Sequence, residues 1–212
     1  MTDKERALLA VEALEKKYPD AICSLNAMNP LQLLIATRLS AQCTDARVNL
    51  VTPALFEKYK TAEDFAAAAP EEVETLIRSC GFFRTKARDI IGMCRKIIDD
   101  FGGKVPDSIE ALTSLPGVGR KTANLIMGDV FGKPAIVTDT HCIRLTNRIG
   151  LVDGIKDPKK VEMALWKIIP PEEGNDFCHR LVEHGRAVCT ARTKPYCDRC
   201  CLAEFCEKNG VE

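Results

Sequence analysis

The sequence predicts an all-α protein, and three observations support this prediction. Apolar residues recur at helical spacing in one segment after another, most clearly along residues 84–100. Residue pairs that typically begin a helix, such as Asn29-Pro30 and Asp157-Pro158, stand ahead of several of these segments. Only residues 135–138, Ala-Ile-Val-Thr, hint at an extended chain, and this stretch is too short to build a sheet.

The first half of the chain predicts six helices in succession. The first covers residues 3–18, where charged residues alternate with an apolar stripe, and the second covers 29–42. The third follows at 44–59, and Thr61 with Asp64 forms a capping box ahead of a short fourth helix. Pro70 opens a fifth helix that ends near Cys80. The sixth, at 84–100, ends at Gly102-Gly103.

The second half predicts shorter helices separated by glycine and proline. Asp107 or Ser108 caps a helix that reaches Leu115, and a second helix follows the turn at 116–119. Further helices are expected from about residue 139, after Asp157, and from about 175 to 188.

Composition limits the classes of protein that the chain can form. The chain has 212 residues, of which 46% are hydrophobic, so it can bury a sizeable core. The formal net charge is +0, which excludes a strongly basic coat, so nucleic-acid binding would depend on local patches. The N-terminal residues are too charged for a signal peptide, and no apolar run is long enough to span a membrane. We therefore expect a cytoplasmic protein that works as a monomer.

The stretch Leu-Pro-Gly-Val-Gly-Arg-Lys at 115–121 predicts a helix, a glycine turn and a second helix. Gly117 and Gly119 allow backbone angles that are closed to other residues, and the second helix presents Ala123, Ile126, Met127 and Val130 as an apolar stripe. Backbone N–H groups at such a turn, with a helix dipole behind them, form an anion site that a phosphate can approach closely. By itself the turn is equally compatible with a purely structural corner.

The chain resembles the endonuclease III family of the helix-hairpin-helix DNA glycosylase superfamily. The resemblance spans essentially the whole chain and is carried by Leu-Ser-Ala-Gln-Cys-Thr-Asp at 39–45, Gly-Phe-Phe-Arg-Thr-Lys-Ala at 81–87, the turn, residues 138–150, His-Gly-Arg at 184–186 and a cysteine-rich tail. It implies two helical lobes: residues 23–133, which contain the hairpin, and residues 1–22 with 134–212, which carry an iron–sulfur cluster. It also implies a partner, double-stranded DNA with a damaged base.

The implied chemistry uses Lys121 and Asp139. A lysine acts as a nucleophile only when neutral, and a helix start together with the burial we expect both disfavour its positive charge. The resemblance implies that Lys121 traps the sugar C1′ as a Schiff base, that β-elimination cuts the strand 3′ to the lesion, and that Asp139 stabilises the developing positive charge. The alternatives are that Lys121 binds phosphate and that Asp139 caps the helix after it.

The resemblance assigns further residues to DNA. Gln42 and Phe82 stand where the family has the residues that fill the gap left by a flipped base, although Phe83 could take this role and either Phe could belong to the core. The pocket is implied to contain Ser40, Thr44, Asp45 and His141, although a lone histidine is more often structural. Backbone contacts are expected from Gly117, Gly119, Arg120, Thr122, Arg192 and Lys194, with a second basic patch at Arg84, Lys86 and Arg88.

The cysteines at the end of the chain predict a metal centre. Cys197 and Cys200 form the one close pair, and Cys189 and Cys206 are widely spaced partners, which suits a loop around a cuboidal cluster better than zinc between two close pairs. The family implies [4Fe–4S] on these four residues, with Cys201 as a non-ligand neighbour. Seven residues separate Cys189 from Cys197, one more than is usual in the family. A disulfide is disfavoured in a cytoplasmic setting.

We therefore expect a base-excision repair enzyme, a DNA N-glycosylase with abasic-site lyase activity on oxidised pyrimidines. Two alternatives stay open at this point. A monofunctional mismatch glycosylase of the same fold would usually lack Lys121, and a DNA-binding module without activity would need neither Lys121 nor Asp139.

Overall fold

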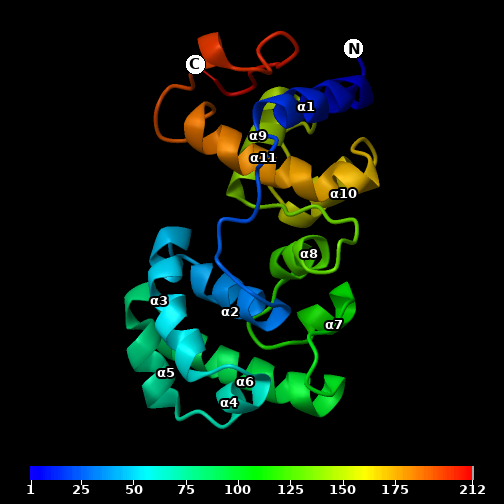
Figure 1. Ribbon diagram of the computed structural model, residues 1–212. Helices are drawn as coiled ribbons and strands as arrows, with labels where there is room; N and C mark the ends of the chain where they lie inside the picture. Colours follow the sequence, from blue (N-terminus) through cyan, green and yellow to red (C-terminus); the bar gives the residue numbers. More distant parts are fainter. Residues whose placement is uncertain (212) are drawn as a thin grey trace. The chain divides into compact units, whose positions relative to one another are not determined.

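The computed structural model describes residues 1–211 and contains helices and connecting loops, without a strand in that range (Figure 1). The α-helices are α1 (Asp3–Lys17), α2 (Pro30–Ser40), α3 (Asp45–Lys58), α4 (Ala62–Ala66), α5 (Pro70–Ile77), α6 (Phe83–Phe101), α7 (Ile109–Thr113), α8 (Arg120–Asp129), α9 (Thr140–Ile149), α10 (Pro158–Leu165) and α11 (Gly174–Ala187). Short 3₁₀ turns follow at η1 (Arg78–Cys80), η2 (Pro171–Glu173) and η3 (Cys197–Arg199). The predicted all-α class is confirmed.

The helices begin where their capping residues predict. The Asn29 side chain accepts a hydrogen bond from Gln32 N at 3.0 Å at the start of α2, and Pro30 occupies the first turn. Thr61 and Asp64 form the expected capping box of α4. Of the two candidates for α7, Ser108 is the cap, since its hydroxyl accepts from Ala111 N. No helix within the described residues is both long and apolar enough to cross a membrane.

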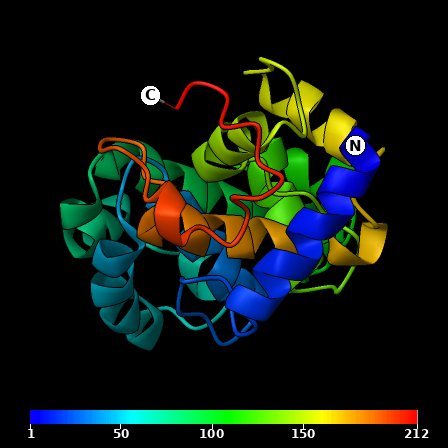
Figure 2. The ribbon, with the colours of Figure 1, turned by 90° about the horizontal axis from the view of Figure 1, so that it is seen from above.

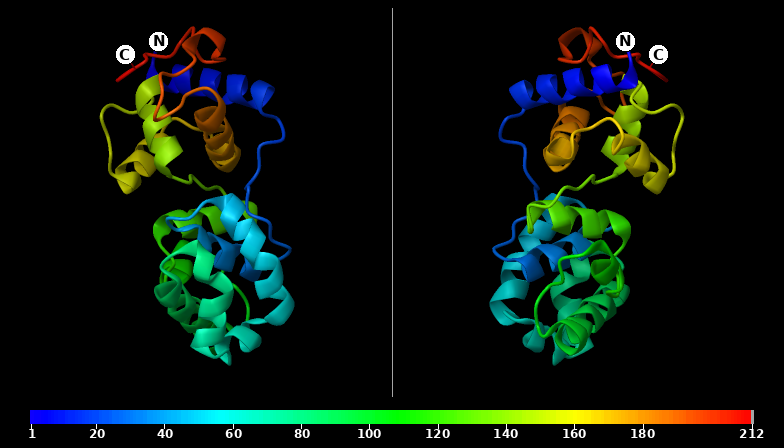
Figure 3. Two further views of the ribbon diagram at one scale, coloured as in Figure 1. Left: turned by 90° about the vertical axis from the view of Figure 1, so that its left-hand side faces the viewer. Right: turned by 90° about the vertical axis from the view of Figure 1, so that its right-hand side faces the viewer.

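The chain divides into two compact units. Unit 1 contains Met1–Ile22 and Gly132–Glu212, and unit 2 contains Cys23–Phe131. The second boundary therefore falls two residues before the one expected after residue 133. Figure 3 shows the two segments in which the chain passes from one unit to the other.

Unit 2 is built around α6, against which α2, α4 and α5 pack. The apolar stripe predicted for this segment is fully buried at Ile90, Cys94 and Ile97. Helix α8 packs on α2 and α7, so the hairpin turn is anchored to the same core.

Unit 1 joins the two ends of the chain. Helix α11 packs against α1 and α9, and α1 lies beside the C-terminal loop (Figure 2). The Arg6 guanidinium donates to Phe205 O at 3.2 Å and Gly150 O at 2.8 Å, and it pairs with Glu207 at 2.6 Å. Residues 135–138, where the sequence hints at an extended chain, are buried and form no strand, and they lie against the start of α11. A Cβ added at Gly174 would stand 2.6 Å from Ala135 O.

Candidate functional site

The hairpin turn is held by two buried apolar residues and a backbone hydrogen bond between them. Leu115 and Val118 are buried, and Val118 N donates to Leu115 O at 3.1 Å. The backbone of Gly117 and Gly119 faces solvent on either side of Val118. Burial of one apolar residue between two exposed glycines turns the backbone outward, which leaves the start of α8 open to a ligand.

The two glycines have different roles. Gly117 has φ +74°, and a Cβ there would lie 2.6 Å from Arg38 Nε and 3.0 Å from Asp89 Cβ. Arg38 and Asp89 form a largely buried ion pair at 2.7 Å, so the turn rests on this pair. Gly119 has φ −95°, which any residue can adopt, and its Cβ position meets nothing within 4 Å. The expectation that both glycines need unusual angles is therefore wrong for Gly119, which supplies open space instead.

Lys121 is exposed in the first turn of α8. The expected burial of this lysine is therefore wrong, and of the two expected features only its position at the helix N-terminus is found. Arg120 is also exposed, and Thr122 is partly so. Asn124 is buried together with residues of the apolar stripe of α8.

Asp139 is the N-cap of α9 in unit 1. Its Oδ1 accepts from Cys142 N at 2.7 Å, and its Oδ2 lies 3.3 Å from His141 Nδ1. Both side chains are only partly exposed, 19% for Asp139 and 24% for His141. Capping holds one carboxylate oxygen, and the second oxygen and the His141 ring are held together at the partly open start of the helix.

Gln42 and Phe82 have left-handed backbones although neither is glycine. Their φ values are +54° and +47°, and both residues are exposed, Phe82 by 67%. Such conformations are costly outside glycine and cluster at functional sites. Phe83 is partly buried, and the guanidinium carbons of Arg78 and Arg84 each lie 5.7 Å from its ring centre. The geometry thus separates the two phenylalanines, of which only Phe82 projects from the fold.

The pocket residues expected in unit 2 lie around the end of α2 and the start of α3. Ser40 donates its hydroxyl to Thr37 O at 2.9 Å, and Thr44 caps α3. Asp45 accepts a hydrogen bond from Ser24. His141 belongs to unit 1, beside Asp139.

One member of the second basic patch is not at the surface. Arg84 and Arg88 are exposed, but Lys86 is 1% exposed. Its Nζ donates to Leu39 O at 2.7 Å and to Cys80 O at 2.9 Å. The assignment of Lys86 to a DNA-facing patch is therefore wrong, because its ammonium group points into unit 2.

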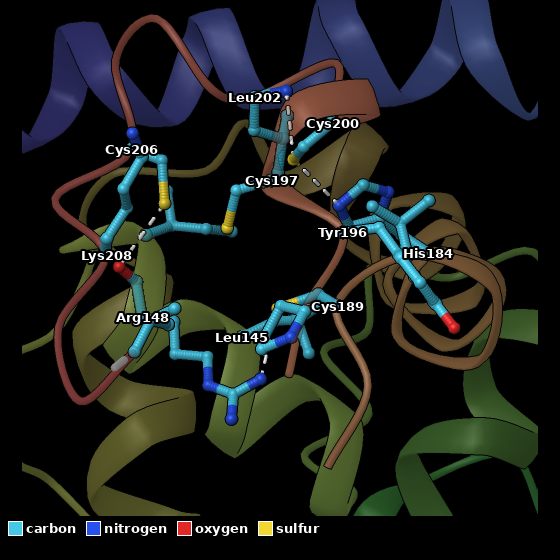
Figure 4. Close-up of a pocket in the computed structure, with 14 residues that line it drawn as sticks. Leu145, Arg148, His184, Cys189, Tyr196, Cys197, Cys200, Leu202, Cys206 and Lys208 are labelled. Atoms are coloured by element: carbon cyan, nitrogen blue, oxygen red, sulfur yellow. Dashed lines mark hydrogen bonds between the residues drawn. The ribbon is translucent and has the colours of Figure 1, made fainter. Parts of the chain in front are cut away.

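Four of the five C-terminal cysteines surround one cavity in unit 1 (Figure 4). Cys189, Cys197, Cys200 and Cys206 line it, and Cys201 does not. The other lining residues are mostly apolar and include Leu145, Ile149, Val188, Pro195 and Leu202. Within residues 1–211, no group of three or more His, Cys, Asp or Glu side chains is placed to hold a metal ion. Four thiols that line a cavity but do not converge on a single point fit a polynuclear group better than one tetrahedral zinc ion.

A second layer of polar groups contacts the cysteine sulfurs. Arg148 Nη1 lies 3.3 Å from Cys189 Sγ, and Leu202 N lies 3.4 Å from Cys200 Sγ. His184 Nε2 lies 3.3 Å from Cys200 Sγ, and its Nδ1 lies 3.1 Å from the Tyr18 hydroxyl. Burial, and then the charge of Lys17, lower the pKa of His184 to about 4, so the ring is neutral at pH 7. These donors suit thiolate ligands, whose charge they can stabilise.

Sequence reasoning missed this second layer. Arg148 lies within residues 138–150, which carry the resemblance, but nothing in the sequence marks it as a neighbour of the cysteines, and Tyr18 belongs to no motif. His184 and Gly185 enter the sequence analysis only through the resemblance. The structure shows why a glycine stands at 185: a Cβ there would lie 2.6 Å from His141 Cδ2. Gly185 therefore lets α11 approach the residue that neighbours Asp139.

The loop between Cys189 and Cys197, which is one residue longer than is usual in the family, contains a local turn. Thr190 Oγ1 donates to Thr193 O at 3.0 Å, and Tyr196 N donates to Val188 O at 3.1 Å. The second bond closes the loop beside the two cysteines that flank it. Arg192 and Lys194 are exposed on the loop.

Comparisons with known proteins agree with this arrangement. Residues 35–171 match the family described as HhH-GPD superfamily base excision DNA repair protein. The chain is 51% identical over 204 residues to endonuclease III of Synechocystis sp., covering 96% of this chain and 92% of that protein. It is 40% identical to endonuclease III of Escherichia coli K12, covering 97% and 96% of the two chains.

The fold is also similar to solved structures. A trapped covalent intermediate of endonuclease III with DNA has a TM-score of 0.92 and 45% identity, covering 99% of this chain and 98% of that one. A thermostable thymine-DNA glycosylase has a TM-score of 0.86 and 25% identity, covering 96% of each chain.

Proposed function

Because the chain belongs to the endonuclease III family of the HhH-GPD base excision DNA repair proteins, we propose that it excises oxidised pyrimidines from duplex DNA and then cuts the abasic strand. One observation carries the lyase assignment: an exposed lysine stands in the first turn of α8, which follows a glycine turn with space for a phosphate. A relative 45% identical in sequence has been trapped in a covalent complex with DNA, which supports a covalent step in this chain as well.

Lys121 is the proposed nucleophile. Its neutral amine attacks C1′ of the damaged nucleotide, and the glycosidic bond breaks with its electron pair leaving on the base, which takes up a proton. The sugar ring opens to give the Schiff base. Loss of a proton from C2′ then expels the 3′ phosphate, which is the β-elimination step. Exposure of Lys121 leaves it accessible to a sugar that has been flipped out of the duplex.

Asp139 is the proposed carboxylate partner. The C1′ centre becomes cation-like as the base leaves, and a fixed negative charge stabilises it more in the transition state than in the ground state. The Cys142 N–H holds one oxygen of Asp139 in place, so the carboxylate needs little reorganisation during the reaction. His141 contacts the other oxygen and would orient it.

DNA binding is assigned to residues of both units, most of them exposed. Gln42 and Phe82 fill the gap left by the flipped nucleotide, since both project from strained backbone positions. Residues at the hairpin and on the cysteine loop contact backbone phosphates: Gly117, Gly119, Arg120, Thr122, Arg192 and Lys194. The proposed pocket residues are Ser40, Thr44, Asp45 and His141.

The proposed cofactor is a [4Fe–4S] cluster on Cys189, Cys197, Cys200 and Cys206. The donor set fits, because four thiols line one largely apolar cavity and neighbouring N–H groups reach two of the sulfurs. When bound, the group cross-links the C-terminal loop, and no step of base release passes through it. Cys201 lies outside the cavity lining and is proposed as a non-ligand.

Borohydride trapping tests the proposed lyase chemistry. Reduction of the Schiff base to an amine should leave wild-type protein covalently attached to abasic DNA. The Lys121→Gln variant should cross-link at least about 10³-fold more slowly than wild type but should still bind DNA, because the substitution removes only the nucleophile. A monofunctional glycosylase or a binding module would give no adduct with the wild-type protein. An adduct formed by Lys121→Gln at the wild-type rate would assign the chemistry to another amine.

A further inference from the structure

Lys86 is buried in unit 2, and no carboxylate among residues 1–211 pairs with it. It stands in the first turn of α6, where the helix dipole disfavours a positive charge. Burial lowers its pKa, and the neighbouring charges that also affect this pKa are those of Cys43, Cys80 and Arg38. A buried ammonium group without an acid partner is costly, so the groups that it does bind are informative.

The two carbonyls that Lys86 binds come shortly before Gln42 and Phe82, the two exposed residues with left-handed backbones. Leu39 O lies at the end of α2, three residues before Gln42, and Cys80 O ends η1, two residues before Phe82. The backbone of Lys86 also donates to Phe82 O at 3.0 Å. One side chain thus joins two loops that are about 40 residues apart in the chain.

The same loops contact each other through their cysteines. Cys43 lies close to Cys80, and burial, followed by the neighbouring Cys43 thiol, raises the pKa of Cys80 to about 11. Cys43 N also donates to Ser40 O at 3.0 Å, which closes the turn that contains Gln42. Lys86 is therefore buried and hydrogen-bonded to both loops, whereas Gln42 and Phe82 on the same loops are exposed.

We propose that Lys86 is a positioning residue for base flipping: its ammonium group fixes the Gln42 loop and the Phe82 loop in one relative arrangement, so that both side chains enter the duplex together. This inference rests on the proposed insertion role of Gln42 and Phe82. Lys86 itself touches no DNA. Its effect is confined to substrates from which a nucleotide must be flipped, because a single-stranded abasic site leaves no stacked gap to fill.

The test compares two reactions of the full-length protein. One is single-turnover excision of thymine glycol from a duplex, and the other is borohydride trapping on a single-stranded abasic oligonucleotide. Lys86→Met keeps the length and apolar stem of the side chain but removes its donors. It should slow duplex excision about 10- to 100-fold, because misplaced groups lose rate steeply, and should leave trapping within about threefold of wild type.

Two controls separate positioning from general destabilisation. Ile97→Val, in the buried part of the same helix, lowers stability without touching the loops and should slow neither reaction selectively. In a Gln42→Ala, Phe82→Ala background, Lys86→Met should add less than about twofold to the excision defect, because the residues through which it acts are gone. If Lys86→Met does not fold, Lys86→Gln, which retains two donors, takes its place, and a smaller selective loss of excision is expected.

The outcomes are distinguishable. Unchanged duplex excision in a folded Lys86 variant overturns the inference, as does an equal loss of both reactions or a full additional loss in the double-mutant background. Wild-type protein that neither excises thymine glycol nor forms the adduct would instead contradict the proposed function.

Discussion

At the scale of single residues, Asp139 combines a structural and a proposed chemical role in one carboxylate. Its Oδ1 caps α9 through Cys142 N, and its Oδ2 faces His141. Asn and Asp are nearly equivalent as helix caps, whereas only Asp supplies a negative charge. The two roles can therefore be separated by substitution.

We expect Asp139→Asn to slow base release about 10²- to 10⁴-fold, the range typical of a positioned acid or base, with little loss of DNA affinity. The amide oxygen keeps the cap, so the free energy of unfolding should stay close to that of wild type. Single-turnover excision, a binding titration and urea unfolding measure the three quantities.

Asp139→Ala is the matched comparison. It removes the cap as well as the charge and should lower the free energy of unfolding by about 1 kcal/mol relative to Asn. If Asp139→Asn and Asp139→Ala are equally destabilised and Asp139→Asn excises the base at the wild-type rate, Asp139 has a structural role only.

At the scale of elements, the hairpin turn joins a strained glycine to an unstrained one. Gly117 requires a left-handed backbone and touches the Arg38–Asp89 pair, whereas Gly119 has an ordinary backbone next to open space. One supports the turn, and the other leaves room for a ligand.

Substitution by alanine should separate these two roles. Gly117→Ala should cost about 1–3 kcal/mol of stability through backbone strain, together with displacement of Arg38. Gly119→Ala should cost less than about 1 kcal/mol, because only the cap preference changes, but should weaken binding to undamaged duplex. Urea unfolding and fluorescence anisotropy measure the two effects. A Gly119→Ala protein with normal stability and wild-type affinity would show that no phosphate approaches this glycine.

The cysteine loop is the second element whose arrangement leads to a sharp prediction. Serine at Cys189, Cys197, Cys200 or Cys206 should cause loss of iron, because each thiol lines the cavity. Serine at Cys201 should retain it. Iron and acid-labile sulfide, measured in the purified variants, should be equal in amount in wild type, with little zinc. Loss of iron from Cys201→Ser together with its retention in Cys200→Ser would contradict the proposed ligand set.

At the scale of the whole molecule, each unit has its own core, so loss of the cluster should be a local event. Arg6 links α1 to the C-terminal loop through Phe205 and Glu207. Without a cluster to hold this loop, α1 loses partners, whereas α6 in unit 2 does not.

We therefore expect faster amide hydrogen exchange in iron-free Cys197→Ser than in wild type across α1 and residues 189–206, with α6 unchanged. Cys201→Ser serves as the iron-loaded control. Equal acceleration in α6 would show that the two units unfold together.

The sequence predicts the helices of this molecule well, because caps and apolar periodicity are local. Asn29-Pro30, the Thr61–Asp64 box and the stripe of α6 each determine their own element. Lys86 and Lys121 show where this reasoning stops. Both lie near the start of a helix, and nothing local shows that the first is buried and the second exposed. Burial depends on distant partners such as Leu39, which no spacing rule identifies.

The discontinuous origin of unit 1 also has a consequence for synthesis of the chain. The ribosome releases unit 2 as one continuous segment after α1 has already emerged. Until Gly150, Phe205 and Glu207 follow, Arg6 lacks the partners that it has in the folded protein. The apolar face of α1, formed by Ala7, Ala10, Val11 and Leu14, stays open during that interval. Helix α1 is therefore synthesised well before the segments of unit 1 against which it packs, and it can dock only after they have emerged.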